Sequence, residues 1–205
     1  SLDVITAVAY DYGDYNDDGF IDIAISGRNS SSNKFTRIYR NNSGTSFTSV
    51  NFGLTNLSSG GVIWEDFDND CDLDLILTGL NSSDSPVTLL YEFDGTDYNL
   101  VTTTLPALSE GSIRITDANN DDKWEIILTG FNSIGQTQAV VYTIDNNLNT
   151  SLYTDGLDNT TFNDLTLTDY NEDGFSDLIQ SGSFGLNATL DDAELYQSNG
   201  VNGYS

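Results

Sequence analysis

Four short segments of the chain carry oxygen-donor side chains at the same spacing. Counted from the first Asp of each segment, the donors fall at positions 1, 3, 5 and 9: Asp14, Asn16, Asp18 and Asp22; Asp66, Asp68, Asp70 and Asp74; Asp117, Asn119, Asp121 and Glu125; Asp169, Asn171, Asp173 and Asp177. Carboxylates this close repel one another unless a cation lies among them. Ca²⁺ takes six to eight oxygen ligands, whereas Mg²⁺ keeps its waters. The spacing therefore predicts up to four Ca²⁺ sites.

Position 7 of each segment is expected to add a backbone carbonyl, from Phe20, Asp72, Lys123 and Phe175. An EF-hand loop needs a bidentate Glu at position 12. The residues there are Ile25, Leu77, Leu128 and Gln180, so the EF-hand is excluded. A plain acidic turn remains the alternative for any single copy, because Asp, Asn and Gly favour turns. Four copies in register favour metal binding.

The four segments are not equivalent at position 6, where we expect a left-handed backbone. Gly19 and Gly174 suit that conformation, Asp122 tolerates it, and Cys71 is strained there. The third segment combines Asp122 with the longer Glu125, so it is the weakest of the four predicted sites.

The acidic segments belong to a repeat that runs through the whole chain. Their first aspartates are separated by 52, 51 and 52 residues, and Gly27, Gly79, Gly130 and Gly182 keep the same spacings. The tyrosines Tyr39, Tyr91, Tyr142 and Tyr196 follow at 52, 51 and 54 residues. This period divides the 205 residues into one repeat domain of four units, at about 1–52, 53–104, 105–155 and 156–205.

Within each unit the apolar pattern is that of β-strands. Residues alternate before each acidic segment, as in Tyr10 and Tyr12, and a continuous apolar run follows it, as in Leu73 to Leu77. A continuous run indicates a strand covered on both faces. A third strand is expected to end near each tyrosine, and a fourth near residues 47 and 204. The sequence thus predicts an all-β propeller of four-stranded blades, either four blades that close on themselves or part of a seven- or eight-bladed ring.

The composition excludes several classes of function. With 32 acidic against 6 basic residues, the formal net charge is −26, which leaves too few cations to bind nucleic acid. The chain has no His, so His-dependent catalytic triads and the common zinc sites cannot form, and the single Cys71 makes no internal disulfide. No run approaches 18 apolar residues, so we expect no membrane insertion.

The segment D-x-[DN]-x-D-G-x-x-D, followed by an apolar strand that ends in Thr-Gly or Ser-Gly, resembles the FG-GAP/VCBS repeats. These are integrin-alpha-like, calcium-binding propeller repeats of secreted and cell-surface proteins. The resemblance covers all four units and departs from the pattern at Cys71, Asp122 and Glu125. It implies Ca²⁺ in the loop between the first two strands of each blade, propellers of seven or eight blades, and a role in adhesion or recognition.

The resulting hypothesis is a calcium-stabilised, extracellular propeller module, secreted or at the cell surface, which acts as a binding, adhesion or scaffold domain. Its partner is expected to be an extracellular protein or glycan, and a homodimer is one way to complete an eight-bladed ring. A lectin-like, carbohydrate-binding propeller is the alternative, because 11 Tyr and 2 Trp offer aromatic surfaces. A polysaccharide-degrading enzyme is a further alternative. We expect no enzyme, because the cluster of Arg28, Lys34, Arg37 and Arg40 is better interpreted as relief of local negative charge.

Overall fold

The described strands form four antiparallel sheets in chain order. The computed structural model of the protein describes residues 5–154, 157–184, 191–198, 200 and 204. Sheet 1 contains β1 (Ile5–Gly13), β2 (Asp22–Asn29), β3 (Lys34–Asn41) and β4 (Phe47–Val50). Sheet 2 contains β5 (Val62–Glu65), β6 (Asp74–Leu80), β7 (Pro86–Phe93) and β8 (Tyr98–Val101). Sheet 3 contains β9 (Ile113–Thr116), β10 (Trp124–Phe131), β11 (Thr137–Ile144) and β12 (Thr150–Thr154).

Sheet 4 contains three described strands, β13 (Thr160–Thr168), β14 (Asp177–Phe184) and β15 (Asp191–Tyr196). The fourth strand expected near residue 204 falls largely on residues outside the described ones, and the described part has an isolated bridge between Ser198 and Tyr204. The described residues contain no helix that is long and apolar enough to span a membrane.

Each sheet is a simple meander, in which every strand pairs with the next one along the chain. The second strand carries the continuous apolar run, and in β6 every residue from Asp74 to Gly79 is buried. Such a strand must be covered on both faces, and the neighbouring sheets provide the cover. The sheets are therefore the blades of a propeller, numbered here 1 to 4, and the predicted all-β, four-bladed architecture is confirmed.

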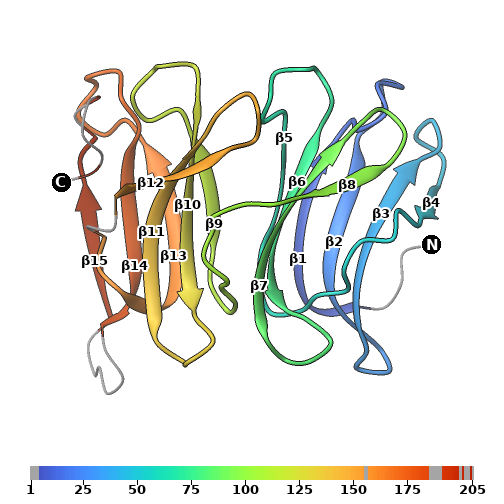
Figure 1. The fold of residues 1–205 in the computed structure, drawn as a ribbon, viewed down its shortest axis with the longest axis horizontal. Helices are drawn as coiled ribbons and strands as arrows, with labels where there is room; N and C mark the ends of the chain where they lie inside the picture. The colour runs from blue at the N-terminus through green and yellow to red at the C-terminus, as the bar shows by residue number, and fades with distance from the viewer. Residues whose placement is uncertain (1–4, 155–156, 185–190, 199, 201–203, 205) are drawn as a thin grey trace.

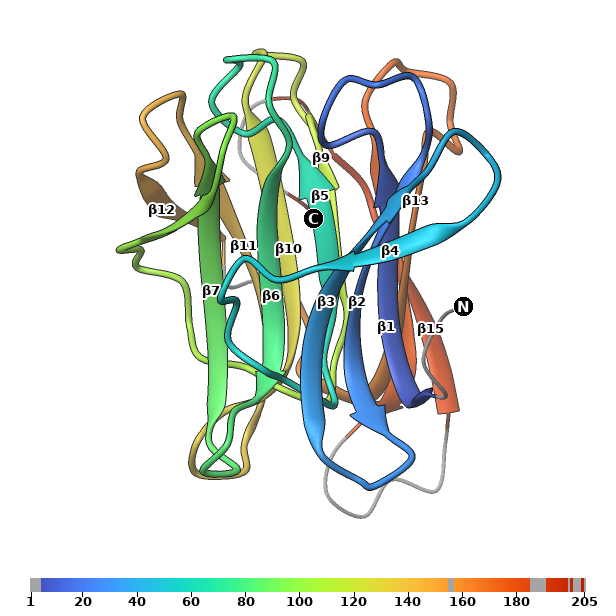
Figure 2. The same ribbon diagram turned by 90° about the vertical axis from the view of Figure 1, so that its right-hand side faces the viewer.

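Three apolar clusters join consecutive blades. Tyr15 and Ile38 of blade 1 pack with Trp64 and Leu77 of blade 2 in the first cluster. The second cluster joins blades 2 and 3, and the third joins blades 3 and 4. In Figure 1 the blades follow one another along the longest axis, with β13–β15 at one end and β1–β4 at the other. Figure 2 shows the same blades from the side of blade 1.

Two of the periodic glycines, Gly79 and Gly130, mark the place where the segment before a blade crosses the second strand of that same blade. Gly79 has a φ of 144°, and a Cβ built on it would lie 2.6 Å from the carbonyl oxygen of Ser58. Gly130 has a φ of 148° and a matching distance of 2.5 Å to Ser109. Only glycine fits a left-handed backbone this close to another chain segment, which explains why these glycines keep the period of the repeat.

Candidate metal centres

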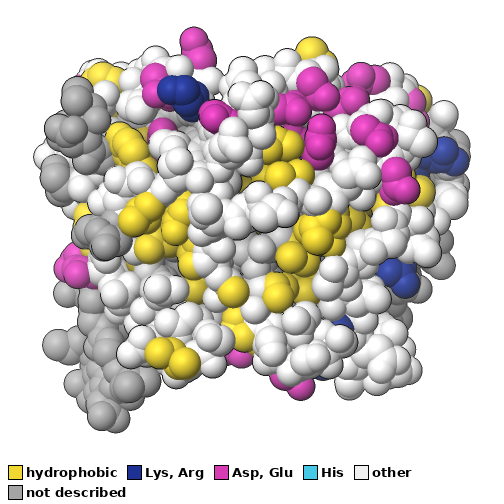
Figure 3. Space-filling view, viewed as in Figure 1, with side chains coloured by type: hydrophobic (Ala, Val, Ile, Leu, Met, Phe, Trp, Pro, Cys, Tyr) yellow, Lys and Arg dark blue, Asp and Glu magenta, His cyan; other side chains and the backbone are white. Residues whose placement is uncertain are grey.

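The four acidic segments form the loops between the first two strands of the four blades. They connect β1 to β2, β5 to β6, β9 to β10 and β13 to β14, and are called loops 1 to 4 here. All four loops lie at the same edge of the molecule, at the top of Figure 1. Acidic side chains gather along this edge in Figure 3. The fold thus places all predicted metal ligands on one side of the propeller.

The four loops share one set of hydrogen bonds. In loop 1 the backbone N–H of Asp18 donates to Asp14 Oδ1 at 3.1 Å, and the N–H of Gly19 donates to Asp14 Oδ2 at 2.7 Å. Asp18 N–H also donates to Asn16 Oδ1, and Phe20 N–H donates to Asp18 Oδ1. The same four bonds recur in loops 2, 3 and 4. These bonds fix the side chains at positions 1, 3 and 5 and leave each oxygen a second lone pair.

The backbone at position 6 is left-handed in every loop, as predicted. The φ angles are 84° at Gly19, 78° at Cys71, 62° at Asp122 and 89° at Gly174. Position 4 is left-handed as well, at Asp17, Asn69, Asn120 and Glu172, which the sequence analysis did not anticipate. Asn and Asp tolerate this conformation better than most residues. Three of the four position-4 residues are Asn or Asp, so the residue types at this position indicate the left-handed backbone.

The acid at position 9 is fully buried in every loop, with Asp22, Asp74, Glu125 and Asp177 all 0 % exposed. In loop 2, Asp74 accepts the backbone N–H of Phe67 at 3.2 Å and that of Phe93 at 3.0 Å. Asp177 is held in the same way in loop 4, by Tyr170 at 3.2 Å and Ser198 at 2.9 Å. In loops 2 and 4 the position-9 carboxylate therefore ties its loop to the C-terminal end of the third strand of the blade.

For three of these carboxylates, those of Asp22, Asp74 and Glu125, burial disfavours the ionised form and raises the pKa. Burial raises the pKa of Asp74 to about 7, with smaller contributions from the nearby Asp68 and Asp70. Burial likewise raises the pKa of Glu125 to about 7, and it raises the pKa of Asp22. A bound divalent cation would offset these shifts, because an opposite charge favours the ionised form.

Loop 3 contains a buried carboxylate oxygen without a hydrogen-bond partner. Ala118 N–H donates to Glu125 Oε2 at 2.7 Å, but Glu125 Oε1 has no partner among the described residues. A buried carboxylate oxygen left in this way is costly. A cation among the loop oxygens fits the observation, since it would coordinate the orphaned atom.

Loop 2 brings three carboxylates together most closely. Ligand atoms of Asp66, Asp68 and Asp70 all lie within 4.8 Å of one another. Asn takes the place of Asp68 in the other loops, so amide oxygens complete their donor sets. Oxygen donors at this density suit a hard cation such as Ca²⁺.

Each position-7 residue lies directly after the left-handed residue, where its N–H donates to the position-5 carboxylate. The distances are 3.0 Å for Phe20, 2.9 Å for Asp72, 3.1 Å for Lys123 and 2.9 Å for Phe175. Coordination by their carbonyls remains a prediction. In loop 3 the ammonium of Lys123 also lies 3.2 Å from Asp121 Oδ2 and would compete with a cation there.

Neighbouring loops are linked to one another by contacts that the sequence did not indicate. The indole N–H of Trp124, next to loop 3, donates to the carbonyl of Asp66 in loop 2 at 3.0 Å. The side-chain amide of Asn120 in loop 3 donates to the carbonyl of Gly174 in loop 4 at 2.9 Å. Ordering one loop is therefore expected to order the next.

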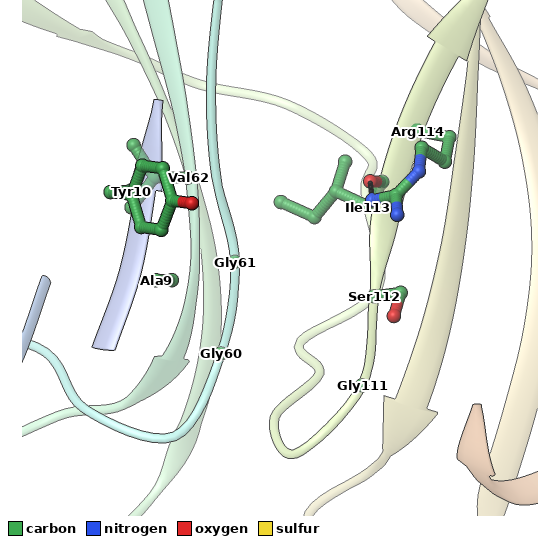
Figure 4. Close-up of a pocket in the computed structure, with 9 residues that line it drawn as sticks. All are labelled: Ala9, Tyr10, Gly60, Gly61, Val62, Gly111, Ser112, Ile113 and Arg114. Carbon is green, nitrogen blue, oxygen red and sulfur yellow. Dashed lines mark hydrogen bonds between the residues drawn. The ribbon is translucent and has the colours of Figure 1, made fainter. Parts of the chain in front are cut away.

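A pocket of about 330 Å³ lies between the first strands of blades 1, 2 and 3. Figure 4 shows Tyr10 and Val62 on one side of it and Ile113 and Arg114 on the other. Arg114 is the one charged side chain of its described lining, and it forms an ion pair with Asp164 at 3.2 Å. The described lining residues include no carboxylate and no thiol, so we assign the pocket no chemistry.

Comparison with protein families matches residues 14–77 to an FG-GAP-like repeat. The matched stretch starts at the first Asp of loop 1 and ends inside β6, so it contains loops 1 and 2 complete. The predicted resemblance is therefore confirmed in this part of the chain, and loops 3 and 4 share the hydrogen bonds of the matched loops. The comparison with curated proteins gives no match.

Proposed function

We propose that this β-propeller with its FG-GAP-like repeat is a calcium-stabilised module that works outside the cell as a binding, adhesion or scaffold domain. The observation that carries the proposal is the set of four loops with one hydrogen-bond pattern, each with a fully buried acid at position 9. The shared hydrogen-bond pattern and the shared buried acid favour one common role for the four loops, which we propose is calcium binding.

The ions in this proposal are structural. Positions 1, 3 and 5 of each loop offer side-chain oxygens, and position 9 lies at the start of the second strand. A cation held by both would fasten the loop to its blade and, through Trp124 and Asn120, to the neighbouring loops. It would also reduce the repulsion within a chain of formal charge −26, which otherwise opposes compaction.

The affinity expected of such sites favours an extracellular location. Extracellular calcium modules have dissociation constants of roughly 10⁻⁴–10⁻³ M, which only a calcium-rich medium satisfies. An extracellular protein or glycan remains the proposed partner, and the absence of enzymatic activity remains a prediction.

Calcium binding to the metal-free protein tests the proposal by isothermal titration calorimetry. We expect up to four ions per chain, fewer after Asp66→Ala, and little response to Mg²⁺. Asp97→Ala is the matched control, because Asp97 lies in the β7–β8 turn, outside the four loops. No measurable binding at millimolar Ca²⁺, or a stoichiometry unaffected by Asp66→Ala, would contradict the proposal.

A further inference from the structure

Each pair of consecutive blades buries equivalent residues. Strands expose alternate residues on opposite faces, so every blade has a leading face, toward the preceding blade, and a trailing face, toward the following one. In blade 2, Val62 and Trp64 pack on blade 1, whereas Phe67 and Leu90 pack on blade 3. The chain therefore makes the same type of interface three times, and the register of the strands identifies the matching positions in all four blades.

Three positions define the trailing face. The first is position 2 of the acidic loop, and the other two are residues of the second and third strands that lie opposite each other in the sheet. In blades 1 to 4 these residues are, in turn, Tyr15, Ala24 and Ile38; Phe67, Ile76 and Leu90; Ala118, Ile127 and Val141; Tyr170, Ile179 and Leu195. In blades 1, 2 and 3 all nine residues are at most 6 % exposed. In blade 4, Tyr170 is 49 % exposed, Leu195 is 43 % exposed, and Ile179 is half-buried.

The leading face shows the converse at the other end of the chain. Its markers are two alternate residues of the first strand: Tyr10 and Tyr12; Val62 and Trp64; Ile113 and Ile115; Leu165 and Leu167. Val62, Trp64, Ile113 and Leu165 are at most 5 % exposed, and Ile115 and Leu167 are half-buried. Tyr10 is 66 % exposed and Tyr12 is 67 % exposed. Between them, Asp11 points to the other face, where it accepts the N–H of Trp64 at 2.8 Å.

We infer that two copies of this chain close an eight-bladed ring, with the trailing face of blade 4 in one copy packed on the leading face of blade 1 in the other. The two faces correspond to the two halves of an interface that the chain already forms between its own blades. On the leading face of blade 1 the exposed part is the first strand, since Ile25 and Tyr39 of its second and third strands are buried. In Figure 1, blades 1 and 4 lie at opposite ends of the longest axis, and in Figure 2 β1 of blade 1 and β13 and β15 of blade 4 lie toward the same side of the molecule, opposite β7 and β12 of blades 2 and 3. The blades therefore form an arc, and the two faces border its open side.

A second copy satisfies both faces at once. Rotation by half a turn places each trailing face against a leading face and creates two identical junctions, which leaves neither end exposed. Eight blades lie within the range that propellers adopt. The inference goes beyond the proposed function, because it rests on burial and register and does not depend on calcium.

The mass of the particle in solution is the first test, measured by light scattering after size-exclusion chromatography in millimolar Ca²⁺. We expect twice the chain mass of 22.3 kDa. A mass of one chain overturns the inference and leaves the two faces to other occupants, such as further repeats. A mass above two chains also overturns it, because head-to-tail contacts that do not close produce open assemblies.

Two substitutions locate the junction. Leu195→Asp on the trailing face and Tyr10→Asp on the leading face are each expected to give a folded monomer, since both side chains are exposed within one chain. Leu100→Asp is the control, because Leu100 is 62 % exposed but lies on the outermost strand of blade 2. A dimer that survives both test substitutions, or one that Leu100→Asp dissociates equally, overturns the proposed junction.

Mixing the two monomeric variants distinguishes this head-to-tail ring from a dimer in which each face meets its own copy. In the ring, the mixture retains one junction between an unaltered trailing face and an unaltered leading face. We therefore expect association of the mixture at concentrations where each variant alone is monomeric. A mixture that stays monomeric at every concentration at which the wild type is dimeric argues against the ring.

Discussion

Replacement of Asp74 by Asn is expected to change the stability of the protein in opposite directions with and without calcium. Asp74 is 0 % exposed and holds the backbone N–H groups of Phe67 and Phe93. In the metal-free fold, burial raises its pKa to about 7, from 3.8. At pH 8 the wild type therefore carries a buried charge that its fold disfavours, whereas the neutral amide of the Asp74→Asn variant carries none.

The size of the effect follows from the pKa and the hydrogen bonds. A pKa difference of about three units corresponds to about 4 kcal/mol at pH 8, because each unit contributes about 1.4 kcal/mol. Asn has a single side-chain acceptor, so one of the two backbone N–H groups faces the amide NH₂ and costs about 1–3 kcal/mol. The metal-free variant is thus expected to be more stable than the wild type by about 1–3 kcal/mol at pH 8. This advantage disappears at pH 5, where the wild-type carboxyl is protonated.

Calcium reverses the comparison. A site filled at 100 times its dissociation constant stabilises the native state by about 2.7 kcal/mol, which takes about 10–100 mM Ca²⁺ for constants of roughly 10⁻⁴–10⁻³ M, and the variant lacks a ligand for loop 2. Urea unfolding followed by tryptophan fluorescence measures both states, with chelator and with about 100 mM Ca²⁺. Asp17→Asn is the matched control, since Asp17 is exposed at position 4, where loops 2 and 3 already carry Asn. A variant that loses several kcal/mol in chelator at pH 8, or gains as much from calcium as the wild type, would refute the reasoning.

Three further predictions follow from the same loops. Because the raised pKa values of Asp74 and Glu125, both about 7, exceed those of the unfolded chain, near 4, the unfolded state binds fewer protons between pH 4 and 7. The unfolding free energy of the metal-free protein is therefore expected to fall as the pH rises through this window in urea titrations, and an increase would contradict the assignment. Cys71 has a φ of 78°, which strains a residue with a side chain, and Cys71→Gly is expected to remove that strain and raise the unfolding free energy by about 1 kcal/mol. A lower urea midpoint for the variant would show that no strain exists there. Trp124 is expected to report calcium binding in loop 2 by its fluorescence, because its indole N–H donates to the carbonyl of Asp66 at 3.0 Å. Trp124→Phe should reduce the signal to what Trp64, stacked on Tyr15 of loop 1, still supplies, and an unchanged signal would contradict the assignment.

The repeat of the sequence was sufficient to predict the fold, because its markers have direct structural causes. The apolar run that precedes Gly79 becomes a strand buried on both faces, and Gly79 itself is required by the crossing of residue 58. The acidic loops follow from local chemistry as well. Their hydrogen bonds join residues at most five positions apart, so the spacing of Asp, Asn and Gly contains the information.

The features that the sequence did not predict depend on contacts between distant residues. Asp74 reaches Phe93 across its blade, and Trp124 of blade 3 reaches Asp66 of blade 2. Register and packing decide such pairs, and a spacing along the chain does not contain them. The exposure of Tyr10 and Leu195 likewise depends on packing, since the matching positions of the other blades are buried.

The dependence of the melting temperature on calcium tests the central proposal most directly. Thermal unfolding is measured with millimolar Ca²⁺, with millimolar Mg²⁺, and with chelator, at constant pH and ionic strength. Structural calcium in the four loops predicts a large decrease on chelation that Ca²⁺ restores and Mg²⁺ does not, because a ligand bound only by the native state stabilises that state. An identical melting temperature under all three conditions would mean that the loops are acidic turns held by their own hydrogen bonds.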